Sequence, residues 1–500
     1  MATALMFQGT GSDVGKSLVV AGLARALVRR GLSVAPFKPQ NMSNNAAVTP
    51  GGGEIGRAQW LQALACGRPA HVDMNPVLLK PEGDRTCQLV VRGRVAGRLS
   101  SHRFRDDRAR LMGVVMESFA RLCRDTDIVL IEGAGSPAET NLRIGDIANM
   151  GFARTARVPV VLIGDIDRGG VIANLVGTHA VLDPPDRALI AGFLINKFRG
   201  ERALFDDGLA EITARTGWPA FGVLPMLSAA ARLPAEDAVV LERTRPKPGA
   251  LRIVLPMLSR IANFDDFDPL AAEPGVGVEM VPPGRPLPVG ANLMVLPGTK
   301  ATLADLAFVR EQGWDIDIRA HVRHGGRVLG LCGGYQMLGR RVVDTHGIEG
   351  RAGAVPGLGL LDIETELGSE KMVGSVTGTD VETGQPVTGY EIHMGHSQGP
   401  DCTRPMLRLG KDGAADGAIS PDGRIQGCYV HGLFAADAFR HAFLARLGRP
   451  GPGIAYKAGL EAALDEIAAD FETHLDIDGL LRFATPVPGT ATGRTAGARA

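Results

Sequence analysis

A glycine-rich stretch near the N-terminus has the composition of a phosphate-binding loop. The segment G-T-G-S-D-V-G-K-S runs from Gly9 to Ser17 between an apolar run and an amphipathic one, which predicts a strand before the loop and a helix after it. Such a loop turns backbone N–H groups toward a phosphate, and the helix N-terminus adds a favourable dipole. Five residues separate Gly9 from Gly15, one more than in the common form of the motif. The predicted nucleotide-binding residues of this loop are Gly9, Thr10, Gly11, Ser12, Asp13, Val14, Gly15, Lys16 and Ser17.

Side chains with the chemistry of phosphoryl transfer stand in and around this loop. Lys16 is expected to reach the β- and γ-phosphates, and the hydroxyl of Ser17 to bind magnesium. Glu132 ends the apolar run I-V-L-I-E, where an acid can face the phosphates, although a solvated acid at a strand end is the alternative. Glu54, in G-G-G-E-I-G, is a second candidate metal ligand or an ordinary helix-start acid. Lys38 follows the next apolar run and could neutralise a phosphoryl group or lie on the surface.

A second reactive segment, V-L-G-L-C-G-G-Y-Q-M-L-G, surrounds Cys332. A strand that runs directly into a cysteine, followed by glycines and a helix, is typical of a nucleophile elbow. The helix N-terminus lowers a thiol pKa in such an elbow, and the N–H of Gly333 would supply one oxyanion donor. Gly298, in the L-P-G-T loop, could supply the second donor, and His431, in Y-V-H-G-L-F, is the natural base. A buried, unreactive cysteine is the alternative, but the three segments together favour a nucleophile.

The composition excludes several classes of protein. Lys+Arg and Asp+Glu are both 54, and a chain without a basic surplus is not expected to bind nucleic acid or an acidic membrane. No run approaches 18 apolar residues, so no membrane span is expected. The six cysteines show no zinc-type spacing, and the N-terminus lacks the basic start of a signal peptide, which favours the cytoplasm. At about 150 residues per domain, the 500 residues predict two to four domains.

Apolar runs alternate with helical patterns over the first half, as in a parallel sheet covered on both faces. We expect a helix at Lys16–Arg30 and a domain over residues 1–243, followed by a proline-rich linker at 244–249. The predicted strands of this domain are Thr3–Gln8, Ser33–Phe37, Asp127–Ile131, Pro159–Ile163 and Leu189–Ile195.

The same alternation restarts after the linker and predicts a second α/β domain over residues 250–447. A helical segment, Ile454–Phe483 within 448–485, is expected to pack back on this second domain, and residues 486–500 are expected to be a disordered tail. The predicted elements of the second domain are strands Leu251–Leu255, Asn292–Leu296 and Val328–Leu331, and helices Leu303–His324 and Gly334–Arg341.

The two halves resemble known enzyme domains. The half around Cys332 is similar to class I glutamine amidotransferase domains, and the first half to dethiobiotin synthetases, whose phosphate loop has the same long spacing. The two in this order resemble the cobyrinic and cobyric acid synthases of cobalamin biosynthesis, and several strings favour the cobyric branch. These strings are Pro39–Asn45, Gly56–Gln59, Met74–Pro81, Asp165–Gly170, Leu194–Gly200 and Gly389–Gly395. The implied fold is α/β, a P-loop parallel-sheet synthetase domain followed by a flavodoxin-like glutamine amidotransferase domain.

The resemblance implies both an activity and residue roles. It makes Cys332 and His431 the glutaminase pair, strengthens Glu132 and Glu54 as metal ligands, and suggests that Asn196 contacts the adenine. It implies ATP, Mg²⁺ and glutamine, and amidation of the b, d, e and g carboxylates of adenosylcobyrinic acid a,c-diamide, in a possible homo-oligomer. One position departs from the pattern, because many relatives carry a glutamate two residues after the histidine, where Leu433 stands here. Either another acid orients His431 or the site works as a Cys–His dyad.

Two alternative functions remain open from the sequence. One is the sister reaction, cobyrinic acid a,c-diamide synthesis. The other is a ParA/MinD-like ATPase switch, in which nucleotide controls partner binding. Such switches usually carry a second lysine early in the phosphate loop, where Thr10 and Gly11 stand here, and they have no use for the Cys332 elbow.

Overall fold

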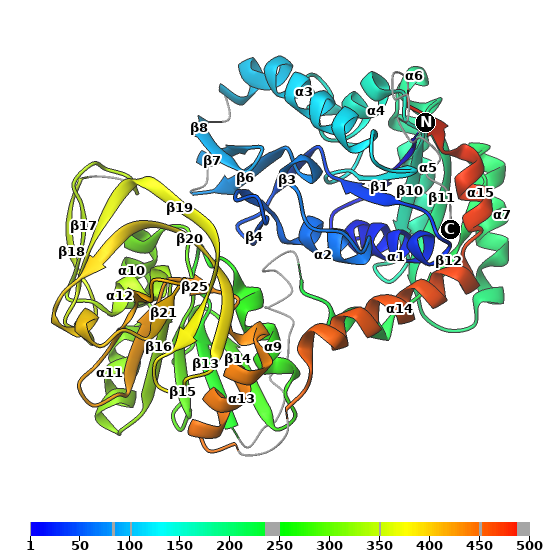
Figure 1. Cartoon of the computed structure of the whole chain (residues 1–500). Helices are drawn as coiled ribbons and strands as arrows, with labels where there is room; N and C mark the ends of the chain where they lie inside the picture. Colours follow the sequence, from blue (N-terminus) through cyan, green and yellow to red (C-terminus); the bar gives the residue numbers. More distant parts are fainter. Residues whose placement is uncertain are drawn as a thin grey trace, which may run out of the picture.

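A computed structural model of the chain describes residues 2–82, 86–100, 103–235, 251–349, 352–449 and 453–487. The predicted linker at 244–249 and residues 488–500 of the predicted tail lie outside this part of the chain. The described chain forms two α/β bodies joined by a long helix near the C-terminus (Figure 1).

The first body is built on a parallel sheet with strand order β12-β11-β10-β1-β9-β2. The strands are β1 (Thr3–Gly9), β2 (Val34–Phe37), β9 (Ile128–Glu132), β10 (Val160–Asp165), β11 (Ile190–Phe198) and β12 (Ala220–Pro225). In β1, Met6 stands opposite Ile131 of β9 and Val160 of β10. All five predicted strands are therefore confirmed as strands, although their ends differ by a few residues. Strand β12, at the edge of the sheet, was not predicted.

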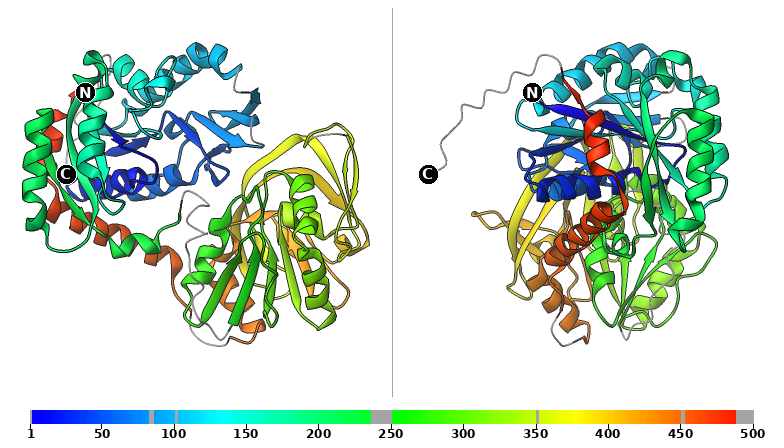
Figure 2. Two further views of the ribbon diagram at one scale, coloured as in Figure 1. Left: turned by 180° about the vertical axis from the view of Figure 1, so that it is seen from behind. Right: turned by 90° about the vertical axis from the view of Figure 1, so that its right-hand side faces the viewer.

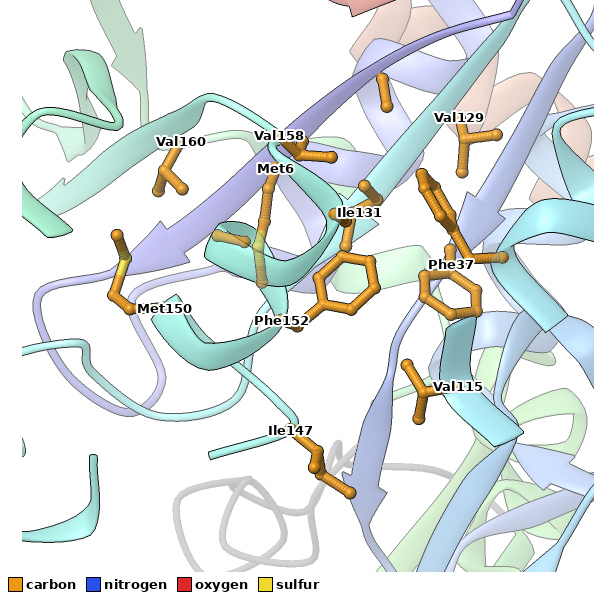
Figure 3. Close-up of a cluster of buried hydrophobic side chains, with 14 of the residues drawn as sticks. Met6, Phe37, Val115, Val129, Ile131, Ile147, Met150, Phe152, Val158 and Val160 are labelled. Atoms are coloured by element: carbon orange, nitrogen blue, oxygen red, sulfur yellow. The ribbon is translucent and has the colours of Figure 1, made fainter. Parts of the chain in front are cut away.

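Helices cover both faces of this sheet because each buried strand sends alternate residues to opposite sides. Met6 lies in one apolar cluster with Phe37 and Phe152 (Figure 3). Leu5 and Phe7 lie in the other cluster. The surrounding helices are α1 (Lys16–Arg29), α2 (Arg57–Ala65), α3 (Arg103–Leu122), α4 (Met150–Ala156), α5 (Val171–Val181), α6 (Pro184–Arg187) and α7 (Asp206–Thr216).

A small sheet that the sequence did not predict extends the first body toward the second (Figure 1). Its order is β3-β6-β7-β8, from β3 (Gln40–Met42), β6 (Val77–Pro81), β7 (Thr86–Val91) and β8 (Arg94–Ser100). Beside it lies the pair β4 (Ala46–Val48) and β5 (Glu54–Gly56). These short strands carry Lys80 and Glu54 to the boundary between the two bodies.

The second body contains a six-stranded sheet with the order β14-β13-β15-β16-β24-β23. Its elements include β13 (Leu251–Pro256), β14 (Val276–Val281), β15 (Leu293–Leu296), β16 (Arg327–Leu331), β23 (Ala418–Ile419), β24 (Ile425–Cys428), α9 (Asp268–Ala272) and α13 (Asp437–Arg446). Neighbours are parallel from β14 to β24, and β23 is antiparallel at the edge.

Two predicted helices of this body have the wrong extent. The segment Leu303–His324 forms two helices, α10 (Thr302–Glu311) and α11 (Trp314–Arg323), because Gly313 between them has a positive φ of 73°. The segment Gly334–Arg341 forms α12 (Gly333–Leu338) only, and Arg341 begins a strand.

That strand belongs to a further sheet dominated by one long hairpin. The path β18-β17-β19-β20-β25 consists of β18 (Gly353–Pro356), β17 (Arg341–Asp344), β19 (Glu364–Asp380), β20 (Pro386–Gln398) and β25 (Val430–His431). Two short strands, β21 (Leu407–Leu409) and β22 (Ala414–Asp416), lie off this path. The hairpin β19–β20 lies on the side of the second body that faces the first (Figure 1).

The C-terminal segment packs on the first body, so the prediction that it packs back on the second is wrong. Helix α14 (Tyr456–His474) runs from the second body to α1 (Figure 2), where Ile467 and Phe471 meet Gly22 so closely that a Cβ there would lie 2.7–2.8 Å from them. Helix α15 (Ile477–Phe483) follows. Strand β26 (Thr485–Pro486) then pairs antiparallel with β1, so the start of the predicted disordered tail is an ordered strand.

None of the described helices combines the length and apolar character that crossing a membrane requires.

Candidate functional site

The Cys332 elbow has the strained geometry that a nucleophile elbow requires. Strand β16 ends at Leu331 and α12 begins at Gly333, with Cys332 between them at φ 51° and ψ −111°. A Cβ on Gly333 would lie 2.6 Å from the Thr299 side chain, and one on Gly334 only 2.0 Å from a backbone oxygen. Glycines therefore permit the tight turn, and Cys332 lies at the N-terminus of the helix.

His431 lies beside Cys332 and is held by an acid that sequence reasoning missed. Nδ1 of His431 is 2.6 Å from Oδ2 of Asp266, and the backbone N–H of Gly432 donates to Oδ1 of Asp266 at 2.7 Å. Burial works against the charged imidazole, but the Asp266 carboxylate and the Cys332 thiol group raise the pKa of His431 to about 10. We call Cys332, His431 and Asp266 the cysteine site.

The sequence left open whether another acid orients His431 or the site works as a Cys–His dyad. Asp266 is such an acid, and it comes from a distant part of the chain. It lies in a short 3₁₀ helix, Phe264–Phe267, after β13, and is 165 residues from His431. No local spacing could connect the two, although the paired acids in N-F-D-D-F, in the segment that follows a predicted strand, were a usable signal. Leu433 is buried in an apolar cluster instead.

The two predicted oxyanion donors lie against this site. Gly298 packs so closely on the His431 ring that a Cβ there would lie 2.7 Å from Cε1, and Gly333 is adjacent to Cys332. Their role as donors stays a prediction. The pocket at Cys332 continues to the other body, because Lys80 and Arg98 line it together with Lys300 and Lys371.

The phosphate loop connects β1 to α1 as the sequence predicted. Asp13 and Gly15 have positive φ values of 56° and 94°, which turn the backbone around the loop. Nζ of Lys16 donates to the carbonyl of Gly11 at 3.0 Å, so the ammonium lies within the loop. Asn196 donates from Nδ2 to the carbonyl of Val14 at 2.9 Å and thereby supports the loop, while its predicted contact to adenine stays a prediction.

The Glu132 carboxylate binds two other residues that the sequence predicted for the phosphate site, Ser17 and Lys38. Its Oε1 accepts hydrogen bonds from Oγ of Ser17 and from Nζ of Lys38, both at 2.8 Å. Its Oε2 accepts from Nε2 of Gln62 at 2.6 Å, a contact that the sequence did not predict. We call Gly9–Ser17, Lys38 and Glu132 the phosphate-loop site.

The donor chemistry of this site fits magnesium. A hydroxyl and a carboxylate are hard oxygen ligands, and Mg²⁺ commonly takes one or two protein ligands with phosphates and waters completing its shell. Ser17 and Glu132 would be those ligands. No group of three or more His, Cys, Asp or Glu side chains that could hold a metal occurs among the described residues.

Glu54 lies apart from these contacts, at the boundary between the two bodies. It is fully buried, and its oxygens pair with Nζ of Lys80 at 2.7 Å and with Lys371 of the second body. Burial disfavours the carboxylate, but the two lysine charges lower its pKa to about 2. A metal at Glu54 would have to replace these lysine contacts, and its role as a ligand stays a prediction.

Family comparisons match both bodies. Residues 5–240 match the model described as CobQ/CobB/MinD/ParA nucleotide binding domain, and residues 252–439 match the CobB/CobQ-like glutamine amidotransferase domain. Fold and family models together define an enzyme that joins a nucleotide-binding domain to a glutamine amidotransferase domain.

Comparison with whole proteins identifies the family within this class of enzymes. The chain is 61% identical over 485 residues to a cobyric acid synthase of Brucella suis biovar 1, covering 97% of this chain and 100% of that one. It is 62% identical over 482 residues to a cobyric acid synthase of Sphingopyxis alaskensis, covering 96% and 99%. The chain belongs to the cobyric acid synthase family, rather than to the ATPase switches or to the a,c-diamide synthases.

Proposed function

We propose that the chain uses ATP and glutamine to convert the b, d, e and g carboxylates of adenosylcobyrinic acid a,c-diamide into amides. The observation that carries the proposal is that Cys332 and His431 lie together in a pocket that both domains line, with His431 hydrogen-bonded from behind to Asp266. A glutaminase would have no reason to share its pocket with a nucleotide-binding domain unless the ammonia were used there.

The cysteine site would release ammonia from glutamine. The Cys332 thiolate attacks the amide carbon, and the N–H groups of Gly298 and Gly333 stabilise the oxyanion. His431 donates its proton to the departing nitrogen, and Asp266 stabilises the imidazolium until then. Ammonia leaves and a thioester remains, which water hydrolyses to glutamate, returning the thiol.

The phosphate-loop site would activate the acceptor, because hydroxide is a poor leaving group from a carboxylate. The corrin carboxylate attacks the γ-phosphorus of ATP, ADP leaves, and ammonia then displaces phosphate from the acyl phosphate to give the amide. Lys16 and Lys38 would offset charge on the transferred phosphoryl group, and Asn196 would contact the adenine. Magnesium held by Ser17 and Glu132, with Glu54 as a further candidate, would supply charge neutralisation to the phosphates.

Three further proposals accompany this reaction. Ammonia must remain unprotonated, so we expect a shielded path from the cysteine site past the boundary between the domains. The six free cysteines, without zinc-type spacing, favour a cytoplasmic enzyme. The third proposal is that the working enzyme is a homo-oligomer.

The experiment that tests the proposal compares nitrogen donors in Cys332→Ser. A serine hydroxyl stays protonated near neutral pH, so glutamine-dependent amide formation should stop. Externally supplied ammonia should still be used, and that rate should rise with pH because only NH₃ is nucleophilic. His431→Ala should give the same pattern.

Two results would contradict the proposal. If Cys332→Ser keeps full glutamine-dependent activity, Cys332 is not the nucleophile. If it also loses ammonia-dependent activity, the two reactions are not divided between the two sites.

A further inference from the structure

Arg57 is a residue of the first domain whose side chain enters the second. It begins α2, within the G-R-A-Q motif at Gly56–Gln59, and its side chain is only 7% exposed. Its guanidinium donates to the Tyr390 hydroxyl at 2.6 Å and pairs with Oδ2 of Asp265, also at 2.6 Å. Both contacts are made by the same nitrogen, Nη2, so this one nitrogen ties the Tyr390 hydroxyl to the Asp265 carboxylate.

Both partners of Arg57 adjoin the cysteine site. Asp265 directly precedes Asp266, which holds His431. The Tyr390 ring stacks on the His431 ring, with centroids 5.6 Å apart and planes 22° apart, and the two residues pair between β20 and β25. Arg57 therefore fixes the His431 ring from two sides without touching it.

Neighbouring contacts make this connection rigid. Nδ2 of Asn263 donates to the Tyr390 hydroxyl and to the carbonyl of Ala46 in the first domain, both at 2.8 Å. The Arg57 guanidinium lies 5.0 Å from the ring centre of Trp60, a cation–π contact within α2. Burial raises the pKa of Asp265 to about 6, and the Arg57 charge opposes that rise.

Helix α2 also contacts the phosphate-loop site. Gln62, one and a half turns beyond Arg57, donates to Glu132 at 2.6 Å. One short helix therefore contacts the phosphate-loop site through Gln62 and, through Arg57, the two residues that adjoin the cysteine site.

We infer that Arg57 is a positioning residue for glutamine hydrolysis, supplied by the nucleotide-binding domain to the Asp265–Asp266 segment and the Tyr390 ring around His431. The inference rests on the proposed function of the cysteine site. It implies that the amidotransferase domain has a fully ordered site only when the first domain is docked against it.

The test measures both nitrogen donors in Arg57→Met of the full chain. The kcat for glutamine hydrolysis should fall about 10- to 100-fold, because a small displacement of His431 impairs proton transfer. The KM for glutamine should change less than about threefold, since Arg57 does not line the pocket at Cys332. Amide formation from ammonia should persist. The kcat of Arg57→Lys should lie between those of wild type and Arg57→Met, because lysine keeps the charge but loses the planar guanidinium that lies against Trp60.

A matched control distinguishes positioning from general destabilisation. Arg121 makes a two-pronged pair with Asp73 at 2.6 and 2.8 Å in the same domain, and this pair does not involve a residue of the cysteine site. Arg121→Met should leave the kcat for glutamine hydrolysis unchanged. If Arg57→Met does not fold, Tyr390→Phe removes one Arg57 contact and keeps the ring, and its kcat should fall several-fold.

Three outcomes overturn the inference. Unchanged glutaminase kcat in Arg57→Lys and Tyr390→Phe would show that the contact positions nothing. Equal losses with glutamine and ammonia would place Arg57 in the synthetase reaction instead. A rise in KM with unchanged kcat would make it a binding residue. Cys332→Ser, assayed in parallel, separates these outcomes from failure of the proposed function, because glutamine hydrolysis by that variant would show that the cysteine site itself is misassigned.

Discussion

The cysteine site and the phosphate-loop site follow the same local plan, a parallel strand that turns sharply into a helix, but they are held in different ways. The three residues of the cysteine site are already arranged for reaction, since Cys332 has a strained backbone and His431 lies 2.6 Å from Asp266. The phosphate-loop site is held by contacts that a nucleotide would compete with, because Lys16 bonds a loop carbonyl and Glu132 pairs with Lys38.

This difference follows from the chemistry proposed for each. Covalent attack by a thiolate requires a nucleophile, a base and an orienting acid in fixed positions before glutamine arrives. Phosphoryl transfer requires charges around a ligand that brings its own phosphates and metal. The first site is therefore sensitive to geometry, and the second to charge.

Asp266→Asn should have the largest effect. We expect glutamine-dependent activity to fall about 10³-fold, because an amide stabilises neither the required tautomer nor the imidazolium. The Asp266 carboxylate is one of the groups that raise the pKa of His431 to about 10, so its loss lowers that pKa. The alkaline limb of the glutaminase pH profile should move to lower pH. An unshifted limb would show that Asp266 does not govern His431.

Lys16→Ala should reduce amide formation about 10²-fold or more with either nitrogen donor, because carboxylate activation precedes amination. The assay compares glutamine and ammonium chloride at saturating ATP. Glutamine hydrolysis alone serves as the internal control and should change much less. Near-normal turnover would remove Lys16 from the phosphate-loop site.

Glu132→Gln keeps the shape of the side chain but removes the charge proposed to hold magnesium. The magnesium concentration required for half-maximal synthesis should rise at least about tenfold. Glutamine hydrolysis without ATP should change little. An unchanged magnesium requirement would reduce Glu132 to a structural partner of Ser17 and Lys38.

Glu54→Gln should raise the magnesium requirement less than Glu132→Gln, because the carboxylate of Glu54 already pairs with two lysines. Its main effect should be to lower the free energy of unfolding by about 3–5 kcal/mol, since Lys80 and Lys371 lose their buried counter-charge. Thermal unfolding of the two variants in parallel measures this. A larger magnesium effect for Glu54→Gln would make Glu54 the principal metal ligand.

The sequence predicted those elements whose residue pattern lies within one short segment. The parallel strands, the phosphate loop and the Cys332 elbow were predictable because each is encoded within about twelve residues. The predicted helix Leu303–His324 was too long because its apolar periodicity continues past Gly313. A single glycine is only a weak signal that a helix ends.

Contacts between distant segments could not be predicted in this way. Asp266 meets His431 only after the second domain has folded. Arg57 meets Asp265, and Glu54 meets Lys371, only after both domains have folded and docked. The packing of α14 on α1 has the same cause, because an amphipathic pattern identifies an apolar face but not the surface that covers it.

The most direct test of the whole account follows the nitrogen atom. The wild-type enzyme is incubated with adenosylcobyrinic acid a,c-diamide, ATP, magnesium and glutamine labelled with ¹⁵N in its amide group, and the corrinoid product is analysed by mass spectrometry. We predict a product with four new amides, each carrying ¹⁵N, and no product when ATP is omitted. A corrinoid that gains no amide, or gains amides without the label, would contradict the account.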